Sequence, residues 1–584
     1  MGDNHVRCCP ICNDIKMCGI FFSIGFEDLS ANVIDSVAHR GPDGRGWNEF
    51  TSPKGPVVMA HRRLAIVDLS TDGHQPMSTE DKRFWVTYNG EIYNYLEIRK
   101  ELEELGYQFK TKTDTEVLLK SYLHWGRECL HKFNGMFAFV IWDDKEKIAF
   151  AVRDRFGVKP LYYYKQGDKI AFASEIKQFK NIFGWVSEIN EEAADHYLKL
   201  GFCDHERETL YKNVFQILPG EQAVIDKEIT ISRWYDLRDY ETELEISDQD
   251  AIEQFKFLFE DAIRLRLRSD VPVGACLSGG IDSTSIVSML RKIQETGQNI
   301  YTFSSVFPGC DVDESTYIDE LASKKNLNSH KNYPTVEEFI EKLDQVLYHQ
   351  DLPFLGTSIF AQWKTFEQAK QHNVTVLLDG QGADESLLGY PGMLNGIVFD
   401  YLKSFQLINL MNFFKWQMLQ NKQSVRNTVL LALQQRHPTC YQFLLKLKNH
   451  NIDFKEDPVR TITEMSFYHF TNNLQSLLRY EDRNSMAFSR ESRLPFLDYR
   501  LVEFIISLQV RKKFRDTTTK WILRESMKDI NLDSILNRKD KIGFATPEQH
   551  WWKKIQNENS IPVDTDFKKF IFNRWLKNEH FSNC

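Results

Sequence analysis

Residues 277–284, LSGGIDST, combine residue types and spacing that point directly to phosphate chemistry. They follow the apolar stretch VPVGACL and open the stretch STSIVSMLRKI, so a strand, a glycine turn and a helix are expected in that order. Glycines let backbone N–H groups converge on an anion, and a helix N-terminus adds partial positive charge. Asp282 would repel a bare phosphate, so its carboxylate is expected to hold Mg²⁺. The loop therefore predicts a magnesium–nucleotide site.

A second loop, LLDGQGADES at 377–386, also leaves an apolar strand through glycines and ends on Asp384 and Glu385. The carboxyl ends of parallel strands meet at one edge of a sheet, so Asp384 is expected to share the Mg²⁺ with Asp282. Late in the chain, NRKDKIGFATP supplies cations, and Lys541 is expected to neutralise a leaving pyrophosphate. The GxxxxGK(S/T) loop is absent, which indicates chemistry on a phosphate other than γ. SGG-x-DS resembles the loop of the ATP pyrophosphatases, which split ATP between its α- and β-phosphates.

A second kind of chemistry is indicated near the start of the chain, where Cys18 lies in KMCGIFF. A cysteine nucleophile needs a base and donors for an oxyanion. His39 and His61 are candidate bases. The α-amine of a chain that begins at Cys18 is a simpler one, because its pKa of about 7.7–8.0 lies near neutral pH. The Asn89 side chain and the Gly90 N–H form a natural oxyanion pair.

Polar groups near this cysteine predict its substrate. Arg63 can grip a carboxylate bidentately, and Asp114, with Glu91 as a further candidate, can hold an ammonium group. One carboxylate grip and one ammonium grip describe an α-amino acid. Because a thiol would attack a side-chain amide, the predicted substrate is glutamine.

Residues 1–17 stand in the way of a free amine at Cys18. Either translation begins at Met17, which is then trimmed, or residues 1–17 form a propeptide that is cleaved before Cys18. Cys8, Cys9 and Cys12 could supply half of a zinc site together with His5, but no second pair of ligands lies nearby, so we expect a leader without metal.

Bulk properties exclude several classes of protein. The 584 residues are 42% hydrophobic and 27% charged, as in ordinary globular proteins of several domains. The net charge of −9 argues against nucleic-acid or anionic-membrane partners. There is no apolar run of about 18 residues and no secretory signal. The ten cysteines are mostly scattered singly, which favours a reducing cytoplasm.

The rhythm of the sequence changes once along the chain. Residues 18–225 read as short strands, including 57–69, 84–94, 136–144 and 169–175, with one helix at 95–105 that is capped by Gly106. An acidic stretch, 236–250, belongs to a linker over 226–250. Beyond it strands and helices alternate, which predicts a parallel sheet. Helices are expected at 251–267, 315–325 and 359–371, strands at 300–307 and 374–379, and an accessory helical layer at 391–455.

From Met17 onward the sequence resembles the glutamine-hydrolysing asparagine synthetases of the bacterial B type. MCGI, HRGPD, RLAIVDL, YNGEIYN, TDTE, RDRFGVKPLYY, SGGIDS, DGQGADE, ESRLPFLD and RKDKIGF occur in the family's order. The resemblance implies an α/β protein of two domains. Residues 18–225 would form an N-terminal-nucleophile α/β/β/α glutaminase sandwich. Residues 251–584 would form a parallel-sheet ATP-pyrophosphatase-like synthetase domain with helical C-terminal additions.

The resemblance also implies the reaction and its residues. L-Aspartate, L-glutamine and MgATP would give L-asparagine, glutamate, AMP and diphosphate through β-aspartyl-AMP, with ammonia crossing an internal tunnel. Cys18, Asn89 and Gly90 would be catalytic, and glutamine would lie against Arg63, Leu64, Ala65, Ile66, Val67, Asn89, Gly90, Glu91 and Asp114. ATP would contact Leu277, Ser278, Gly279, Gly280, Asp282, Ser283, Ser305, Asp379, Gly380 and Lys541. Arg493 is a candidate cation of the acceptor site, and a homodimer is expected because members are often dimers.

Two departures from the family, one at Gln381 and one in the leader before Met17, keep two alternatives open. Better-known members carry Ser-Gly-Glu-Gly where this chain has Asp379-Gly380-Gln381-Gly382, and the glutamate that matches Gln381 is thought to assist the intermediate or the ammonia step. Glutamine cannot act as a base. A second hypothesis is therefore an amidotransferase for another carboxylate, such as a polysaccharide uronic acid or a peptide. A third is a silent regulatory homologue in which residues 1–17 keep Cys18 blocked.

Overall fold

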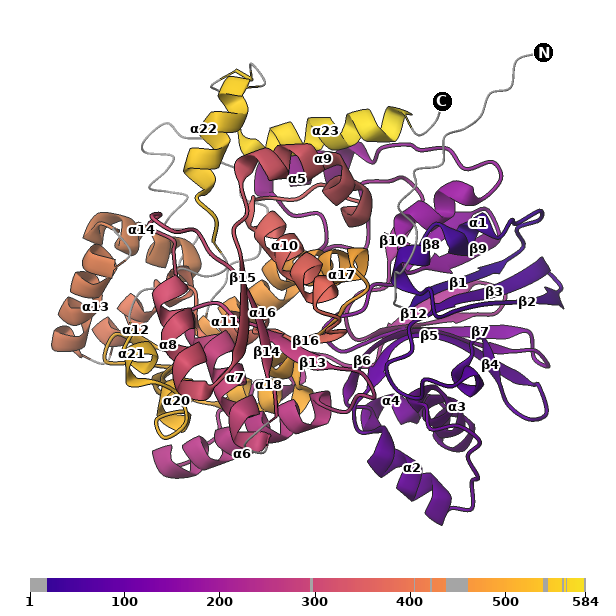
Figure 1. Cartoon of the computed structure of the whole chain (residues 1–584), viewed down its shortest axis with the longest axis horizontal. Helices are drawn as coiled ribbons and strands as arrows, with labels where there is room; N and C mark the ends of the chain where they lie inside the picture. Colours follow the sequence, from indigo (N-terminus) through magenta and orange to yellow (C-terminus); the bar gives the residue numbers. More distant parts are fainter. Residues whose placement is uncertain are drawn as a thin grey trace.

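The computed structural model describes residues 18–294, 298–403, 405–420, 423–436, 461–538, 545–558, 561–562 and 565–581. Two stacked antiparallel sheets lie on one side of the molecule and a parallel sheet lies on the other (Figure 1). Among the described residues, no helix is both long and apolar enough to cross a bilayer.

The N-terminal half is a double-sheet sandwich. One sheet has the order β10-β8-β9-β1-β3-β2, with bounds Val214–Gln216, Tyr162–Gln166, Lys169–Ala173, Gly19–Ile24, Gly55–Arg63 and Gly44–Ser52. The other has the order β12-β11-β7-β6-β5-β4, with bounds Ile229–Arg233, Glu221–Ile225, Ile148–Arg153, Gly135–Asp143, Phe84–Ile92 and Met77–Ser78. Neighbouring strands run antiparallel throughout both sheets.

Apolar side chains of both sheets meet in one core, including Phe22 of β1 and Trp142 of β6. Helices cover the outer faces: α2 (Tyr95–Glu104), α3 (Asp114–Trp125) and α4 (Cys129–Lys132) pack on the β5–β6 side, and α1 (Asn32–Asp35) packs on the β1 side (Figure 1). Central strands such as β1 and β6 are apolar on both faces, because successive side chains point to opposite faces and one face meets the other sheet while the other meets the helices. The expected α/β/β/α sandwich is confirmed.

The second half is built on a five-stranded parallel sheet of order β15-β14-β13-β16-β17. The strands span Asn328–Asn332, Tyr301–Ser305, Val273–Cys276, Val376–Leu378 and Glu491–Arg493. The helices around it include α6 (Asp248–Arg266), α7 (Ile281–Ile293), α8 (Ser315–Lys325), α9 (Val336–Gln350), α10 (Ser358–Gln371) and α11 (Ala383–Leu387). Strand order reverses between β13 and β16, and ligands of such sheets bind at this switch point.

Helical additions complete the second half. Helices α12 (Ile397–Lys403), α13 (Leu407–Gln420) and α14 (Val425–Arg436) form a separate layer at the left of Figure 1. This confirms the helical prediction for that part of 391–455, whereas residues 437–455 lie outside the described ranges. Helices α16 (Ile462–Thr471) and α17 (Asn473–Ala487) return the chain to the sheet, and α22 (Glu548–Glu558) and α23 (Phe567–Phe581) pack beside α9.

Most predicted elements occur within a few residues of their expected bounds, and the helix at 315–325 matches α8. The strand predicted at 57–69 is wrong in its second half, because β3 ends at Arg63 and residues 64–69 form a loop. Part of the acidic stretch 236–250 is ordered structure, since Ser247 caps α6, which begins at Asp248.

The C-terminal helix α23 is fixed by Trp575. Its indole is 1% exposed, and its N–H donates to the Asp351 carbonyl at 2.8 Å. We expect Trp575→Ala to lower the free energy of unfolding by about 3–5 kcal/mol, because it empties a large buried volume. Phe183→Ala is the control, since Phe183 is 86% exposed. Chemical denaturation that gives equal midpoints for the two variants would contradict the packing described here.

Candidate functional site

Cys18 lies at the start of β1 and opens into a pocket between the two antiparallel sheets and the loop after β3. We call it the Cys18 pocket. Of the residues predicted from sequence, Cys18, Arg63, Leu64, Ile66, Val67, Gly90, Glu91 and Asp114 line it. Ala65 and Asn89 do not belong to this lining, although the N–H of Ala65 fixes the same loop by donating to Asp43 at 3.0 Å. The structure thus gathers most of the predicted residues around one sulfur.

The thiol of Cys18 has no base beside it among the described residues. The Leu64 N–H donates to its sulfur at 3.3 Å, and burial raises the pKa of the Cys18 thiol to about 12. Neither histidine serves it: His39 hydrogen-bonds Glu175 at 3.1 Å, and His61 hydrogen-bonds the Tyr88 carbonyl at 3.0 Å. Both histidines are therefore excluded as its direct base, which leaves the α-amine as the candidate.

Asn89 and Gly90 have the properties of an oxyanion pair. The Asn89 side-chain nitrogen is buried and has no hydrogen-bond partner among the residues that the structure describes, although such a buried donor is costly to leave unpaired. Gly90 has φ +151°, and a Cβ there would lie 2.1 Å from the Met136 carbonyl oxygen. Only glycine fits this backbone. The unpaired donor is what a site that waits for a developing negative oxygen requires.

The two side chains predicted to bind the carboxylate and the ammonium group of the substrate, Arg63 and Asp114, lie on different elements. Arg63, at the end of β3, donates to the Ser70 and Asp68 carbonyls at 2.6 and 2.5 Å, which fixes its guanidinium at the pocket. Asp114 begins α3 and accepts from the Tyr88 hydroxyl at 2.7 Å and the Ile92 N–H at 2.9 Å. Burial is the main cause that raises the pKa of Asp114 to about 6. A bound ammonium would favour its charged form.

Glu91 connects this pocket to the second half of the chain. Its carboxylate lies 3.5 Å from the guanidinium of Arg493, which also binds Glu491 at 2.6 Å. Arg493 further donates to the Arg266 and Arg268 carbonyls and is fully buried. The prediction that placed Arg493 in the acceptor site is wrong, because its guanidinium is directed to the Cys18 pocket.

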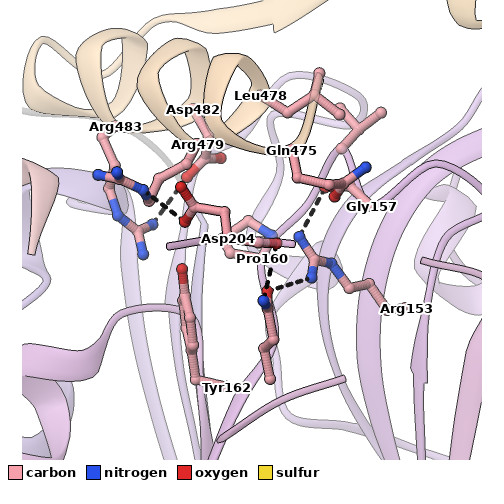
Figure 2. Close-up of a pocket in the computed structure, with 12 residues that line it drawn as sticks. Arg153, Gly157, Pro160, Tyr162, Asp204, Gln475, Leu478, Arg479, Asp482 and Arg483 are labelled. Atoms are coloured by element: carbon pink, nitrogen blue, oxygen red, sulfur yellow. Dashed lines mark hydrogen bonds and ion pairs between the residues drawn. The ribbon is translucent and has the colours of Figure 1, made fainter. Parts of the chain in front are cut away.

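Helix α17 contributes several buried charged side chains to the contact between the halves. Figure 2 shows Arg479, Asp482 and Arg483 projecting from it toward Arg153, Tyr162 and Asp204 of the N-terminal half. Arg479 binds Asp204 at 2.7 Å. The cavity among these side chains has a volume of about 10 Å³, the space of one water, so the interface is closely packed.

The predicted nucleotide loop lies at the switch point between β13 and β16. Ser278 and Ser283 hydrogen-bond each other at 3.0 Å, and the Gly279 N–H donates to Glu314 at 3.0 Å. A carboxylate oxygen thus already lies where the loop presents a backbone donor, which is the contact a phosphate oxygen would make. Leu277 and Gly280 complete the turn into α7.

Asp282 and Asp384, the predicted magnesium ligands, converge on one cation. Both bind the ammonium of Lys520, at 2.5 and 2.6 Å, and Lys520 is 4% exposed. Gly389 leaves room for this cluster, because a Cβ there would lie 1.7 Å from an Asp384 oxygen. Carboxylate oxygens from two loops are the donors that Mg²⁺ prefers, so these residues fit the ion.

The remaining predictions for this site have mixed outcomes. Gly380 lies against Asp282, with 3.2 Å from its ideal Cβ to that of Asp282, so Asp379 and Gly380 border the loop. The Ser305 hydroxyl lies 2.7 Å from both the Asn332 side-chain oxygen and the Ala361 carbonyl, and its contact with ATP stays a prediction. Gln381 is half-buried. Lys541 lies outside the described residues, as do Cys8, Cys9 and Cys12.

Sequence reasoning missed two cations. Lys520 has φ +55° in the turn before α20 (Trp521–Ser526), and Arg538 donates to the Gly279 carbonyl at 2.9 Å and binds Glu314 at 2.6 Å. Arg538 belongs to the NRKDK stretch, so this motif contacts the nucleotide loop through Arg538, whereas the sequence analysis predicted Lys541. Lys520 follows three threonines, and no local pattern marks it.

Comparisons with known proteins agree with this architecture. Residues 17–235 match the glutamine amidotransferase domain family, and residues 254–560 match the asparagine synthase family. The chain is 33% identical to asparagine synthetase (glutamine-hydrolyzing) 1 of Bacillus subtilis, covering 91% of this chain and 86% of that protein. It is 37% identical to putative asparagine synthetase (glutamine-hydrolyzing) 2 of Methanocaldococcus jannaschii, covering 66% and 78%, and 26% identical to amidase chyE of Penicillium rubens, covering 90% and 85%.

The fold and the two sites define a glutamine amidotransferase joined to an ATP-using α/β domain. The chain belongs to the asparagine synthase family.

The raised pKa of Cys18 predicts its reactivity. In the full chain, alkylation of Cys18 by iodoacetamide should be slow at pH 7 and rise about tenfold per pH unit up to pH 10, because the thiolate fraction follows a pKa of about 12. A chain that begins at Cys18 should react fast near neutral pH. Peptide mass spectrometry separates Cys18 from the exposed Cys310. Fast alkylation of the full chain at pH 7 would refute this account.

Proposed function

We propose that this protein is a glutamine-hydrolysing asparagine synthetase that makes asparagine from aspartate, glutamine and ATP. The observation that carries the proposal is the pairing of two sites through buried contacts. The Cys18 pocket is lined by the fixed guanidinium of Arg63 and by Asp114, and the Asn89 nitrogen belongs to β5, the strand that gives Gly90 and Glu91 to the lining. Glu91 contacts Arg493 of β17, which pairs with β16, the strand that leads into the second loop.

In the first half-reaction, the Cys18 sulfur attacks the side-chain amide carbon of glutamine. Its proton passes to the α-amine of Cys18, which must therefore be free, so we propose that the active chain begins at Cys18. The Asn89 nitrogen and the Gly90 N–H stabilise the oxyanion. Arg63 binds the substrate carboxylate, and Asp114 with Glu91 binds its ammonium. Collapse of the intermediate releases ammonia and leaves a thioester, which water hydrolyses to glutamate.

We propose an apolar path for the ammonia. Leu64, Ile66 and Val67 beside Cys18 form one buried cluster with Val376 of β16 and Met486 of α17. Apolar walls let neutral ammonia pass but do not solvate ammonium, so the cluster would keep the nucleophile unprotonated. It ends at the strand that carries the second loop.

In the second half-reaction, the β-carboxylate of aspartate attacks the α-phosphorus of ATP, pyrophosphate leaves, and ammonia then displaces AMP from β-aspartyl-AMP. The loop N–H groups, Lys520 and Arg538 are placed to offset the charge on the phosphates. Asp282 and Asp384 would hold Mg²⁺, which neutralises phosphate charge when bound. We also propose a cytoplasmic location, in keeping with the scattered cysteines, and a homodimer, which the family resemblance suggests.

A second candidate acceptor is a different carboxylate, such as a uronic acid or a peptide. Gln381 favours it, because the side chain at this loop position carries no base, and relatives such as amidase chyE share the scaffold without the name of a synthetase.

Purified protein that begins at Cys18 should form asparagine, AMP and pyrophosphate in equal amounts from glutamine, aspartate and MgATP. Amino-acid analysis and pyrophosphate release measure this. If the protein forms glutamate but no asparagine, and amidates a uronic acid or a peptide, the acceptor is the second candidate and not aspartate.

Asn89→Ala should lower kcat for glutamate release by about 10²–10³, because one oxyanion donor is lost. Its thermal midpoint should stay near that of the wild type, since the Asn89 nitrogen has no partner to lose. Asparagine synthesis from ammonium chloride should also be unchanged. A variant that loses ammonia-dependent synthesis as well would show that Asn89 acts on folding instead.

A further inference from the structure

Three side chains of metal-ligand type meet beside β10, an edge strand of the first antiparallel sheet. His196 belongs to α5 (Glu191–Leu200), and His205 and Glu206 follow in the loop between α5 and β10. One ligand atom from each side chain lies within 4.8 Å of the other two. In the described ranges of the chain, no other three histidine, cysteine, aspartate or glutamate side chains meet this condition. None of the three lines the Cys18 pocket.

The distances within this group suit a shared zinc ion better than hydrogen bonds. The Glu206 carboxylate lies 3.5 Å from Nδ1 of His196 and 3.6 Å from Nε2 of His205. An N–H···O hydrogen bond is shorter, at about 2.7–3.2 Å. Zn²⁺ binds imidazole nitrogen and carboxylate oxygen at about 2.0–2.2 Å, so two of its tetrahedral ligands lie about 3.4 Å apart. The observed distances therefore match side chains that surround one ion.

Other contacts hold the backbone that carries these ligands. His196 directly precedes Tyr197, which is fully buried and fixes this part of α5 in the core. In the loop, the side-chain amide of Gln216 donates to the carbonyls of Asp204 and Glu206, at 3.0 and 2.5 Å. Gln216 is itself 3% exposed. A backbone held in this way loses little freedom when a ligand binds, which lowers the cost of binding.

The donor atoms favour zinc over magnesium. Two imidazole nitrogens and one carboxylate oxygen form a ligand set of zinc proteins in which water fills the fourth position. The exposed fraction of the side chain is 33% for His196, 15% for His205 and 50% for Glu206, so water can reach the ion. Asp282 and Asp384 offer oxygen alone, which is the donor that Mg²⁺ prefers. The two groups of ligands would therefore take different ions.

The group lies next to the contact between the two halves of the chain. Asp204, directly before His205, binds Arg479 of α17 at 2.7 Å (Figure 2). It also accepts from the hydroxyl of Ser476, on the same helix, at 2.8 Å. An ion that joins α5 to this loop would therefore also restrain the backbone of the residue that holds α17.

We propose that His196, His205 and Glu206 bind one Zn²⁺ ion per chain, with water as the fourth ligand. The ion cross-links α5 to the loop that carries Asp204 and so stabilises the packing of α17 on the sandwich. No step of the glutamine or ATP chemistry passes through this site, so the inference does not rest on the proposed function.

Zinc binding is measured on the full chain by isothermal titration calorimetry and by metal analysis after dialysis, with excess Mg²⁺ present to fill the oxygen sites. Every protein carries Cys8→Ser, Cys9→Ser and Cys12→Ser, because thiolates bind zinc as well. We expect one equivalent of Zn²⁺ at the site. Zinc should also raise the thermal midpoint, since an ion that binds the folded state stabilises it.

His196→Ala and His205→Ala should each weaken this binding by at least about 100-fold, because an outer-shell partner alone is worth about 10- to 100-fold in metal affinity. Without zinc their thermal midpoints should stay near that of the parent protein, since both side chains are partly exposed. Zinc should no longer raise these midpoints. Glu206→Gln keeps the shape of the side chain, removes its charge, and gives the same comparison if a histidine variant does not fold.

His131→Ala is the matched control. Nε2 of His131 lies 3.9 Å from a carboxylate oxygen of Glu128, but this pair has no third ligand close enough among the described side chains. The control should keep both the zinc equivalent and the rise in thermal midpoint. Parent protein that binds no zinc, variants of His196 and His205 that bind zinc as tightly as the parent, or zinc binding that leaves the midpoint unmoved would overturn the inference.

Discussion

Arg40 is the residue on which both halves of the molecule depend. Its fully buried guanidinium donates to the Cys18 carbonyl at 2.9 Å, to Glu175 at 2.8 Å and to both oxygens of Asp482 at 2.8 and 3.1 Å. A buried cation without partners is strongly destabilising, whereas a fully hydrogen-bonded one is tolerated. Because Asp482 belongs to α17, the position of the nucleophile is set by a helix more than 400 residues away. Without the second half of the chain, the buried guanidinium of Arg40 would therefore lack Asp482, one of its two carboxylate partners.

Helix α17 transmits this constraint to the second site. Asp482 and Arg483 contact Arg40, Glu175 and the Ser174 carbonyl of the N-terminal half, whereas Glu481 accepts hydrogen bonds from Ser492 of β17 and Gln362 of α10 in the second half. Successive residues of a helix are rotated by about 100°, so one turn can address both sites. A displacement of α17 would disturb the backbone of Cys18 and the contacts of Glu481 with β17 and α10 together.

The parts that the sequence predicted well depend on local patterns. The strand–glycine–helix order at 277–284, the helix at 315–325 and the alternating strands of the sandwich are fixed by neighbours within a few positions. The convergence of Asp282 and Asp384 followed from strand order alone. Lys520 and Arg538 could not be found in this way, because their partners lie more than 130 residues away. Arg493 was assigned to the wrong site because a buried guanidinium can face either side of an edge strand. Helix α17 was not predicted, since its buried face carries charges that mimic an exposed surface.

Strand β17 has a consequence for how the protein is made. It pairs with β16 across an interval of more than 110 residues that contains α12–α14, and its Arg493 reaches Glu91 in the Cys18 pocket. Synthesis adds roughly 5–20 residues per second, so the sandwich emerges from the ribosome many seconds before this strand does. Until then the pocket lacks Arg493, and Arg40 lacks Asp482. A nascent chain would thus hold an unfinished nucleophile site, and ammonia release would begin only once the domain that consumes it is there to receive it.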